Sequence, residues 1–196
     1  FRDPWTNIDF YKDLKLTKTA DKRHKKLEND VLVQSDIVLT IGKQLSKELK
    51  TLGAKRVEII ENGFDPQDFL DNANHELDEK FSIAHIGSFT PSRNHMVLWK
   101  ALSHLVDEQD EFKSKLEIKL IGKVDYSVLQ SIKDFGLESY LKKIDYVSHN
   151  EVIKHQKTSK LLLLMVNNTP NAKGIITGKV FEYMASKRPI LAIGPK

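Results

Sequence analysis

Short apolar runs alternate with amphipathic segments along most of the chain, and the alternation is clearest after residue 80. These runs have the length of buried strands, and the stretches between them are long enough for helices. We expect strands at 81–86, 116–121, 143–147, 161–166 and 190–193, and helices at about 92–109, 126–135, 149–158 and 179–187. Strands that alternate with helices are typical of a parallel sheet covered on both faces. The pattern therefore predicts an α/β fold with a Rossmann-like parallel sheet over residues 76–196.

The first part of the chain repeats the pattern incompletely. Helical spacing and apolar runs predict a helix, a strand, a second helix and a second strand at 18–35, 36–41, 43–52 and 57–60. Residues 65–80 then carry Pro, Asn and Asp without apolar periodicity, as linkers between domains do. We therefore divide the chain into 1–75, a partial second Rossmann-like domain with its linker, and 76–196.

Composition removes several classes of function. The 196 residues include no cysteine, which excludes disulfides, thiolate zinc sites and cysteine nucleophiles. The net charge of +4 is too mild for a typical nucleic-acid binder, so no nucleic-acid partner is expected. The longest apolar run, Leu161 to Val166, is far too short to span a bilayer. The chain begins with Phe1 and stops just after the last expected strand, so we interpret it as a piece of a longer protein.

Candidate ligand-binding residues follow the expected strands. In parallel sheets of this kind, ligands bind beyond the carboxyl ends of the strands. Glycine lets the backbone approach a ligand, and lysine or arginine neutralises phosphate, although a glycine after a strand can equally be an ordinary turn. The residues at these positions are Gly87, Ser88, Arg93, Gly122, Tyr146, Val147, Thr177, Gly178, Lys179 and Glu182. Their types predict a ligand that carries phosphate.

Glu182 is unusual because the helical turn around it, 180–185, is otherwise apolar. A carboxylate in such a turn either faces a ligand or destabilises the helix. Rival motifs are absent from the sequence: Gly178-Lys179 lacks the spacing of a P-loop, and no Asp-x-Asp or His-Glu-x-x-His occurs. We therefore expect neither a metal nor a cofactor at this site.

The segment 174–192 resembles the donor-binding signature of GT-B glycosyltransferases, and it is most similar to the retaining family 4 type that builds bacterial surface polysaccharides. Three more segments, 60–65, 83–88 and 146–149, resemble the end of that family's first domain, the opening of its second domain and the strand end beside the nucleotide base. The resemblance implies a GT-B fold. In it, 1–75 is the last portion of the acceptor domain and 76–196 is a truncated donor-binding domain.

Carried over by position, the resemblance assigns Glu182 to the ribose hydroxyls of the donor nucleotide. Gly174 stands where the family has a second glutamate, so no residue is assigned to the donor sugar, and no catalytic side chain is assigned either. The other implied contacts are those of the diphosphate with Lys179, Arg93 and the backbone of Thr177 and Gly178, and those of the base with Tyr146 and Val147.

The implied activity is metal-independent transfer of a sugar from a nucleotide-diphosphate sugar, UDP- or GDP-linked, to a sugar or lipid-linked acceptor. We expect a cytoplasmic location and no transfer by this fragment alone. The basic run 22–26 is either a solvated helix face or a peripheral contact with anionic lipid at the inner face of the membrane. Two other functions stay open: a non-hydrolysing sugar-nucleotide epimerase of the same architecture, and a non-catalytic nucleotide-binding module.

Overall fold

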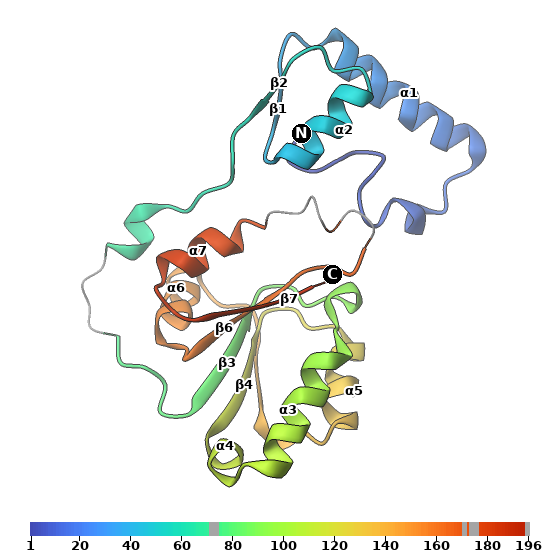
Figure 1. Cartoon of the computed structure of the whole chain (residues 1–196). Helices are drawn as coiled ribbons and strands as arrows, with labels where there is room; N and C mark the ends of the chain where they lie inside the picture. The colour runs from blue at the N-terminus through green and yellow to red at the C-terminus, as the bar shows by residue number, and fades with distance from the viewer. Residues whose placement is uncertain (71–74, 170–171, 173–176, 195–196) are drawn as a thin grey trace. The chain divides into compact units, whose positions relative to one another are not determined.

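The computed structural model describes residues 1–70, 75–169, 172 and 177–194, and Figure 1 shows their secondary structure. These residues fall into two units. Unit 1 comprises residues 1–63 with 169–178, and unit 2 comprises residues 64–168 with 179–196. The assignment of these units to an acceptor and a donor domain, like the division at residue 75, stays a prediction.

Unit 2 is built on a sheet of five strands, ordered β5-β4-β3-β6-β7, in which every pairing is parallel. A helix or a pair of helices lies between successive strands, so the predicted α/β fold with a Rossmann-like parallel sheet is confirmed. The strands are β3 (Phe81–Ile86), β4 (Leu116–Ile121), β5 (Leu141–Ile144), β6 (Leu161–Met165) and β7 (Ile190–Ile193). The helices are α3 (Met96–Glu108), α4 (Asp110–Lys115), α5 (Tyr126–Asp134), α6 (His149–Thr158) and α7 (Lys179–Ala185).

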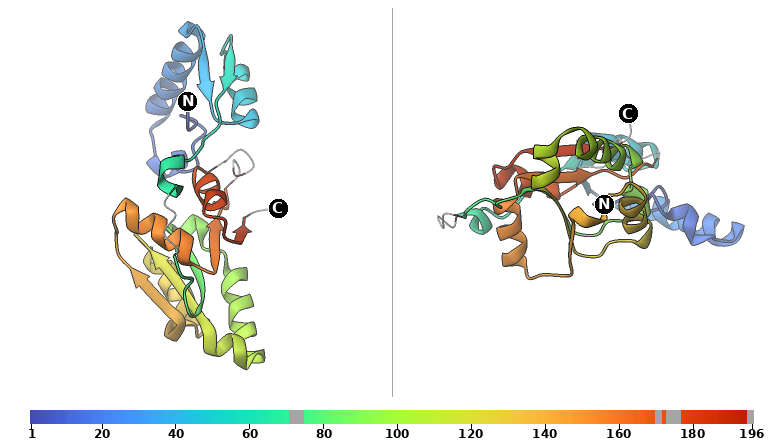
Figure 2. Two further views of the ribbon diagram at one scale, coloured as in Figure 1. Left: turned by 90° about the vertical axis from the view of Figure 1, so that its left-hand side faces the viewer. Right: turned by 90° about the horizontal axis from the view of Figure 1, so that it is seen from below.

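Both faces of this sheet are covered. Alternate residues of a strand point to opposite faces, and the buried clusters follow that alternation. On one face, Ile83 and Leu163 pack in a cluster with Trp99 of α3, and on the other, Ala84 packs in a cluster with Tyr183 of α7. Figure 2 shows helices on both sides of the strands. This double burial explains why the central strands are mostly apolar in the sequence, with β6 apolar throughout.

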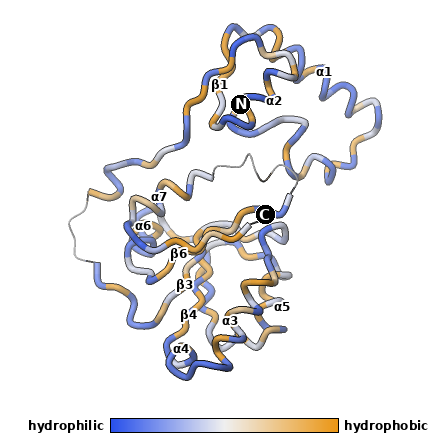
Figure 3. The backbone as a smooth tube through the Cα atoms, in the orientation of Figure 1, coloured by the Kyte–Doolittle hydropathy of each residue, from blue (hydrophilic) through white to orange (hydrophobic). Residues whose placement is uncertain are grey.

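The central strands match their predicted ranges because they are buried on both faces. Nearly every residue of β3, β4 and β6 is buried, and Figure 3 shows β6 as a hydrophobic stretch, whereas hydrophobic and hydrophilic positions mix along β3 and β4. The predicted third strand, 143–147, is wrong in its bounds, since β5 runs from Leu141 to Ile144. β5 lies at an edge of the sheet and holds two exposed lysines, Lys142 and Lys143, which interrupt the apolar run. Tyr146 lies beyond the strand and is 94% exposed.

The helix expected from residue 92 begins later than predicted. Pro91–Arg93 form a single 3-10 turn, and α3 starts at Met96. Asn94 separates the two with a non-helical ψ of 87°, and its Oδ1 accepts a hydrogen bond of 2.7 Å from Nε1 of Trp99. The Nδ2 of Asn94 also donates to Oγ of Ser131 on α5 at 2.9 Å, so side-chain contacts hold Asn94 outside the helix.

Unit 1 contains two helices, α1 (Lys18–Gln34) and α2 (Lys43–Thr51), and a parallel pair of short strands, β1 (Val38–Thr40) and β2 (Val57–Ile59). All four elements were predicted at these places, with strands somewhat longer than observed. A small cluster of Leu32, Val38, Leu45, Leu49, Ala54 and Val57 forms the core of this unit.

Candidate functional site

Two glycine bends form the floor of the candidate site at the carboxyl ends of β3 and β4. Gly87 and Gly122 have φ values of 109° and 108°, a region that side chains with a Cβ rarely adopt. The N–H of Gly87 donates to the carbonyl of Ile121 at 2.7 Å, and that of Gly122 donates to the carbonyl of Ile144 at 2.9 Å. A Cβ on Gly122 would lie 3.2 Å from the carbonyl oxygen of Gly87. The two bends therefore lie directly against each other.

Lys179, the first residue of α7, brings a positive charge to this floor. Its Nζ lies so close to the Gly87 bend that a Cβ on Gly87 would be 2.6 Å from it. Burial and, next, the positive charge of Arg93 lower the pKa of Lys179 to about 8, although the charge of Glu182 raises it in part. The surroundings of Lys179 thus disfavour its charged form, and an anion bound beside it would stabilise that form.

Arg93 is fixed by the loops that follow β3 and β6. Its Nε donates to Oδ1 of Asn167 at 2.6 Å, and its Nη1 donates to the carbonyl of Ser88 at 2.9 Å. Asn168 donates its N–H to the carbonyl of Ser92 at 2.8 Å, which ties the same two loops together. The guanidinium is therefore held in one orientation, close enough to lower the pKa of Lys179.

Glu182 lies one turn after Lys179 on α7 and meets a side chain from α6. Oε2 of Glu182 accepts a hydrogen bond of 3.0 Å from Nε2 of Gln156. Tyr183, next to Glu182, is completely buried, and its hydroxyl accepts the N–H of Ile86 at 3.3 Å. This contact anchors α7 to the end of β3, so the helix presents Lys179 and Glu182 beside the glycine bends.

A cavity of about 280 Å³ lies between these groups. It brings together six of the predicted site residues: Gly87, Gly122, Tyr146, Val147, Lys179 and Glu182. Ser88 lines a neighbouring cavity of about 400 Å³, with Gly87, Gly122 and Tyr146 in its wall as well. Arg93 is not among the lining residues of either cavity. Thr177 and Gly178 belong to unit 1, and Gly174 lies outside the described residues.

Five residues that line the first cavity were not among the predicted site residues: Ile86, Ile121, His149, Val152 and Gln156. Ile86 and His149 do fall within the segments 83–88 and 146–149 that carry the resemblance. A signal for Gln156 did exist. It follows Val152 by four positions and Ile153 by three, so it occupies the apolar side of the predicted helix. A polar side chain that is buried at such a position destabilises the fold. Its presence there therefore points to a function.

One buried histidine near the site has a structural role. His85 is 1% exposed, and its Nδ1 donates to the carbonyl of Leu163 at 3.1 Å. Its ring lies tilted by 49° against that of Phe89, with the two centroids 4.6 Å apart. Burial and, next, the charge of Lys179 lower its pKa to about 4. His85 is therefore neutral at physiological pH and links β3 to β6.

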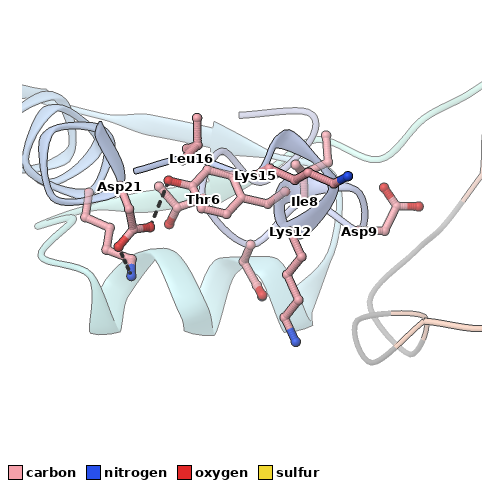
Figure 4. A pocket seen from close by; sticks show the side chains of 10 residues that line it. Thr6, Ile8, Asp9, Lys12, Lys15, Leu16 and Asp21 are labelled. Atoms are coloured by element: carbon pink, nitrogen blue, oxygen red, sulfur yellow. Dashed lines mark hydrogen bonds and ion pairs between the residues drawn. The ribbon is translucent and has the colours of Figure 1, made fainter. Parts of the chain in front are cut away.

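Unit 1 has a cavity of its own, of about 510 Å³, lined by residues between Thr6 and Lys25 (Figure 4). Inside it, Asp21 accepts hydrogen bonds from the hydroxyl of Tyr11 at 3.2 Å and from Nζ of Lys25 at 2.8 Å. Figure 4 shows Lys12 and Lys15 extending in different directions. The charges of this cavity are thus partly neutralised within the protein, and Lys12 and Lys15 do not converge on one point.

The described residues contain neither a cluster suited to a metal ion nor a helix suited to a membrane. No group of three or more His, Asp or Glu side chains in that part of the chain could hold a metal ion. None of the helices in the same part is both long and apolar enough to cross a membrane.

No family model and no curated protein matches the sequence. Among solved structures, the chain is similar to Anabaena HepE in complex with UDP, with 15% identity over 91% of this chain and 50% of that one, and a TM-score of 0.68. It is also similar to S. aureus TarM in complex with Fondaparinux, alpha-GlcNAc-glycerol and UDP, with 17% identity over 87% of this chain and 32% of that one, and a TM-score of 0.63. The chain has the GT-B fold.

A third GT-B structure, WaaG, is described as a glycosyltransferase involved in lipopolysaccharide biosynthesis. It shares 11% identity with this chain over 91% of this chain and 50% of its own length, with a TM-score of 0.63. The chain thus spans between 32% and 50% of the length of these three structures. At such identities the likeness establishes the GT-B fold alone.

Proposed function

We propose that the chain is part of a glycosyltransferase that takes its sugar from a nucleotide-diphosphate sugar and holds the donor nucleotide in the cavity of unit 2. One observation carries the proposal: Lys179 and Glu182 lie one turn apart on α7, beside the paired bends at Gly87 and Gly122. A nucleoside diphosphate offers an anion to the lysine and ribose hydroxyls to the carboxylate. The UDP bound to HepE and TarM, which share the fold, supports the same ligand class.

In the proposed complex, Lys179 binds the diphosphate and Arg93 adds a second positive charge. Both charges stabilise the diphosphate as it departs from the sugar, which is the electrostatic form of catalysis. Glu182 accepts from the ribose hydroxyls. Tyr146, exposed at the rim, and Val147 flank the base. No described residue is assigned to chemistry on the sugar itself.

The finer features of the activity are part of the same proposal. We infer a retaining, metal-independent enzyme similar to family 4, with a UDP- or GDP-linked donor and a sugar or lipid-linked acceptor in surface polysaccharide synthesis. Residues 1–75 then belong to the acceptor domain. A cytoplasmic location with a basic α1 at the inner membrane face fits a lipid-linked acceptor. The compared structures named above give no support to the epimerase alternative.

Metal independence gives the first test. We expect UDP or GDP to bind residues 1–196 with the same affinity in EDTA and in excess magnesium, because Lys179 and Arg93 already supply positive charge near the glycine bends. Calorimetric titration of both nucleotides under the two conditions measures this. A loss of affinity of about tenfold or more on chelation would contradict the metal-independent site, and no binding of either nucleotide would contradict the proposed function.

The second test removes the proposed ribose contact. Glu182→Ala is expected to weaken nucleotide binding by about 1–3 kcal/mol, because charge-assisted hydrogen bonds to the ribose are lost, and to leave the domain folded. Calorimetry measures the affinity, and circular dichroism the fold. Glu138→Ala, which removes an exposed carboxylate away from the cavity, is the matched control and should bind like the parent. If Glu182→Ala unfolds the domain without changing the affinity of the folded fraction, Glu182 is structural.

A further inference from the structure

Gln156 occupies a position where an apolar side chain would suit the fold better. It lies on α6 in line with Val152 and Ile153, is 1% exposed, and lines the unit 2 cavity beside Ile86 and Ile121. Burying an amide among apolar side chains destabilises a protein unless both ends of the amide are hydrogen-bonded. Packing alone therefore does not account for a glutamine here.

Only the nitrogen of the Gln156 amide is hydrogen-bonded among the described residues. Its Nε2 donates to Oε2 of Glu182 at 3.0 Å, while its Oε1 is buried and has no hydrogen-bond partner among the described residues. A carboxylate can only accept, so the amide must turn its nitrogen toward Glu182 and leave its oxygen on the other side. The amide thus keeps its bond to Glu182 although its own oxygen is left without a donor, an arrangement that is unfavourable for stability.

We propose that Gln156 is a positioning residue of the nucleotide site: it fixes Oε2 of Glu182 so that Oε1 of the same carboxylate is aligned to accept a ribose hydroxyl. This inference rests on the proposed function. A glutamate side chain that is free to rotate loses conformational entropy when it binds a ligand, and a side chain already held by a neighbour loses less. Gln156 thereby makes recognition of the ribose stronger without touching the ligand.

The experiment compares UDP with 2′-deoxy-UDP on the parent chain and on Gln156→Met, which keeps the length of the side chain and removes its donor. The parent is expected to bind UDP about tenfold more tightly than 2′-deoxy-UDP, because only UDP offers the 2′-hydroxyl to Glu182. Gln156→Met is expected to bind UDP about tenfold more weakly than the parent and to lose most of that preference. Its thermal unfolding midpoint should be equal or higher, because the unpartnered buried oxygen is gone.

Gln130→Met is the matched control. Gln130, on α5, also donates its amide to a carboxylate, Oδ1 of Asp134 at 2.7 Å, but it does not line the cavity. This variant should keep both the affinity and the preference for UDP. A double variant completes the test: on a Glu182→Ala background, Gln156→Met should have no further effect on UDP affinity, since the two residues act through one contact.

The possible outcomes separate the two proposals. If the parent binds no UDP, the proposed function fails and the role of Gln156 fails with it. If the parent prefers UDP over 2′-deoxy-UDP and Gln156→Met keeps that preference, only the role of Gln156 is overturned. If Gln156→Met unfolds or melts at a lower temperature, the glutamine supports the fold and the positioning role is likewise overturned. Loss of the preference in a folded variant of unchanged or greater stability supports the proposal.

Discussion

The affinity of the chain for UDP is expected to fall as the pH rises above about 8, by up to about tenfold per pH unit. The reason is the pKa of Lys179, which burial lowers to about 8, whereas an exposed lysine titrates near 10.4. The diphosphate binds the protonated lysine, and at pH 8 about half of the lysine is already neutral in the free protein. Above that pH, each binding event must first return a proton to Lys179, so affinity decreases.

Calorimetry at pH 8.5 in two buffers of different ionisation enthalpy measures that proton directly. We expect net uptake of protons on binding, because the anion raises the pKa of Lys179 again. Neither His85 nor the phosphate contributes to this uptake: His85, with a pKa of about 4, is already neutral, and a terminal phosphate loses its last proton near pH 6.

Two lysine variants test whether the pH dependence of UDP affinity comes from Lys179. Lys179→Met should bind weakly and show no change in affinity between pH 7 and 9.5. Lys123→Met removes an exposed lysine from the wall of the neighbouring cavity and should keep the full pH dependence of the parent. An affinity of the parent for UDP that stays constant up to pH 9.5 would contradict the placement of Lys179 on the diphosphate.

Most of the sheet could be predicted from the sequence because its central strands are buried on both faces. A strand of this kind is apolar at most positions: β6 is apolar throughout, and the polar residues of β3 and β4 are Ser82, His85, Glu117 and Lys119. The edge strand β5 has no such constraint, so Lys142 and Lys143 obscured its start. The start of α3 was missed for another reason: it depends on the bond between Asn94 and Trp99, a specific side-chain contact that propensity does not reveal.

The candidate site was predictable where it depends on topology. Parallel strands end at one edge of the sheet, so Gly87 and Gly122 had to come close once the strand order was known. Gln156 was missed because it reaches the cavity from the last turn of α6, not from a loop after a strand. The lowered pKa of Lys179 was not predictable either, since it depends on burial and on the distance to Arg93.

The largest effect on stability is expected at a buried ion pair on the sheet. Nζ of Lys119, in β4, lies 2.6 Å from Oδ2 of Asp78, and the two side chains are only 4% and 19% exposed. Asp78→Ala should lower the free energy of unfolding of unit 2 by about 3–5 kcal/mol, because it leaves a buried ammonium without its partner. The carboxylate of Glu117, 3.9 Å from Nζ, compensates only in part and places the expected loss near the lower end of that range. Urea unfolding followed by circular dichroism measures the change.

The geometry also predicts how that loss can be reversed. Adding Lys119→Met to Asp78→Ala removes the unpaired charge and should recover most of the stability, since apolar side chains can replace a buried ion pair. Glu111→Ala breaks a salt bridge of similar length, 2.7 Å to Lys115, between exposed side chains, and should leave the unfolding curve unchanged. Folded Asp78→Ala should bind UDP like the parent, because Asp78 does not line the cavity. An Asp78→Ala variant as stable as the parent would mean that Lys119 reaches water or loses its proton at little cost, and that this pair does not hold the sheet together.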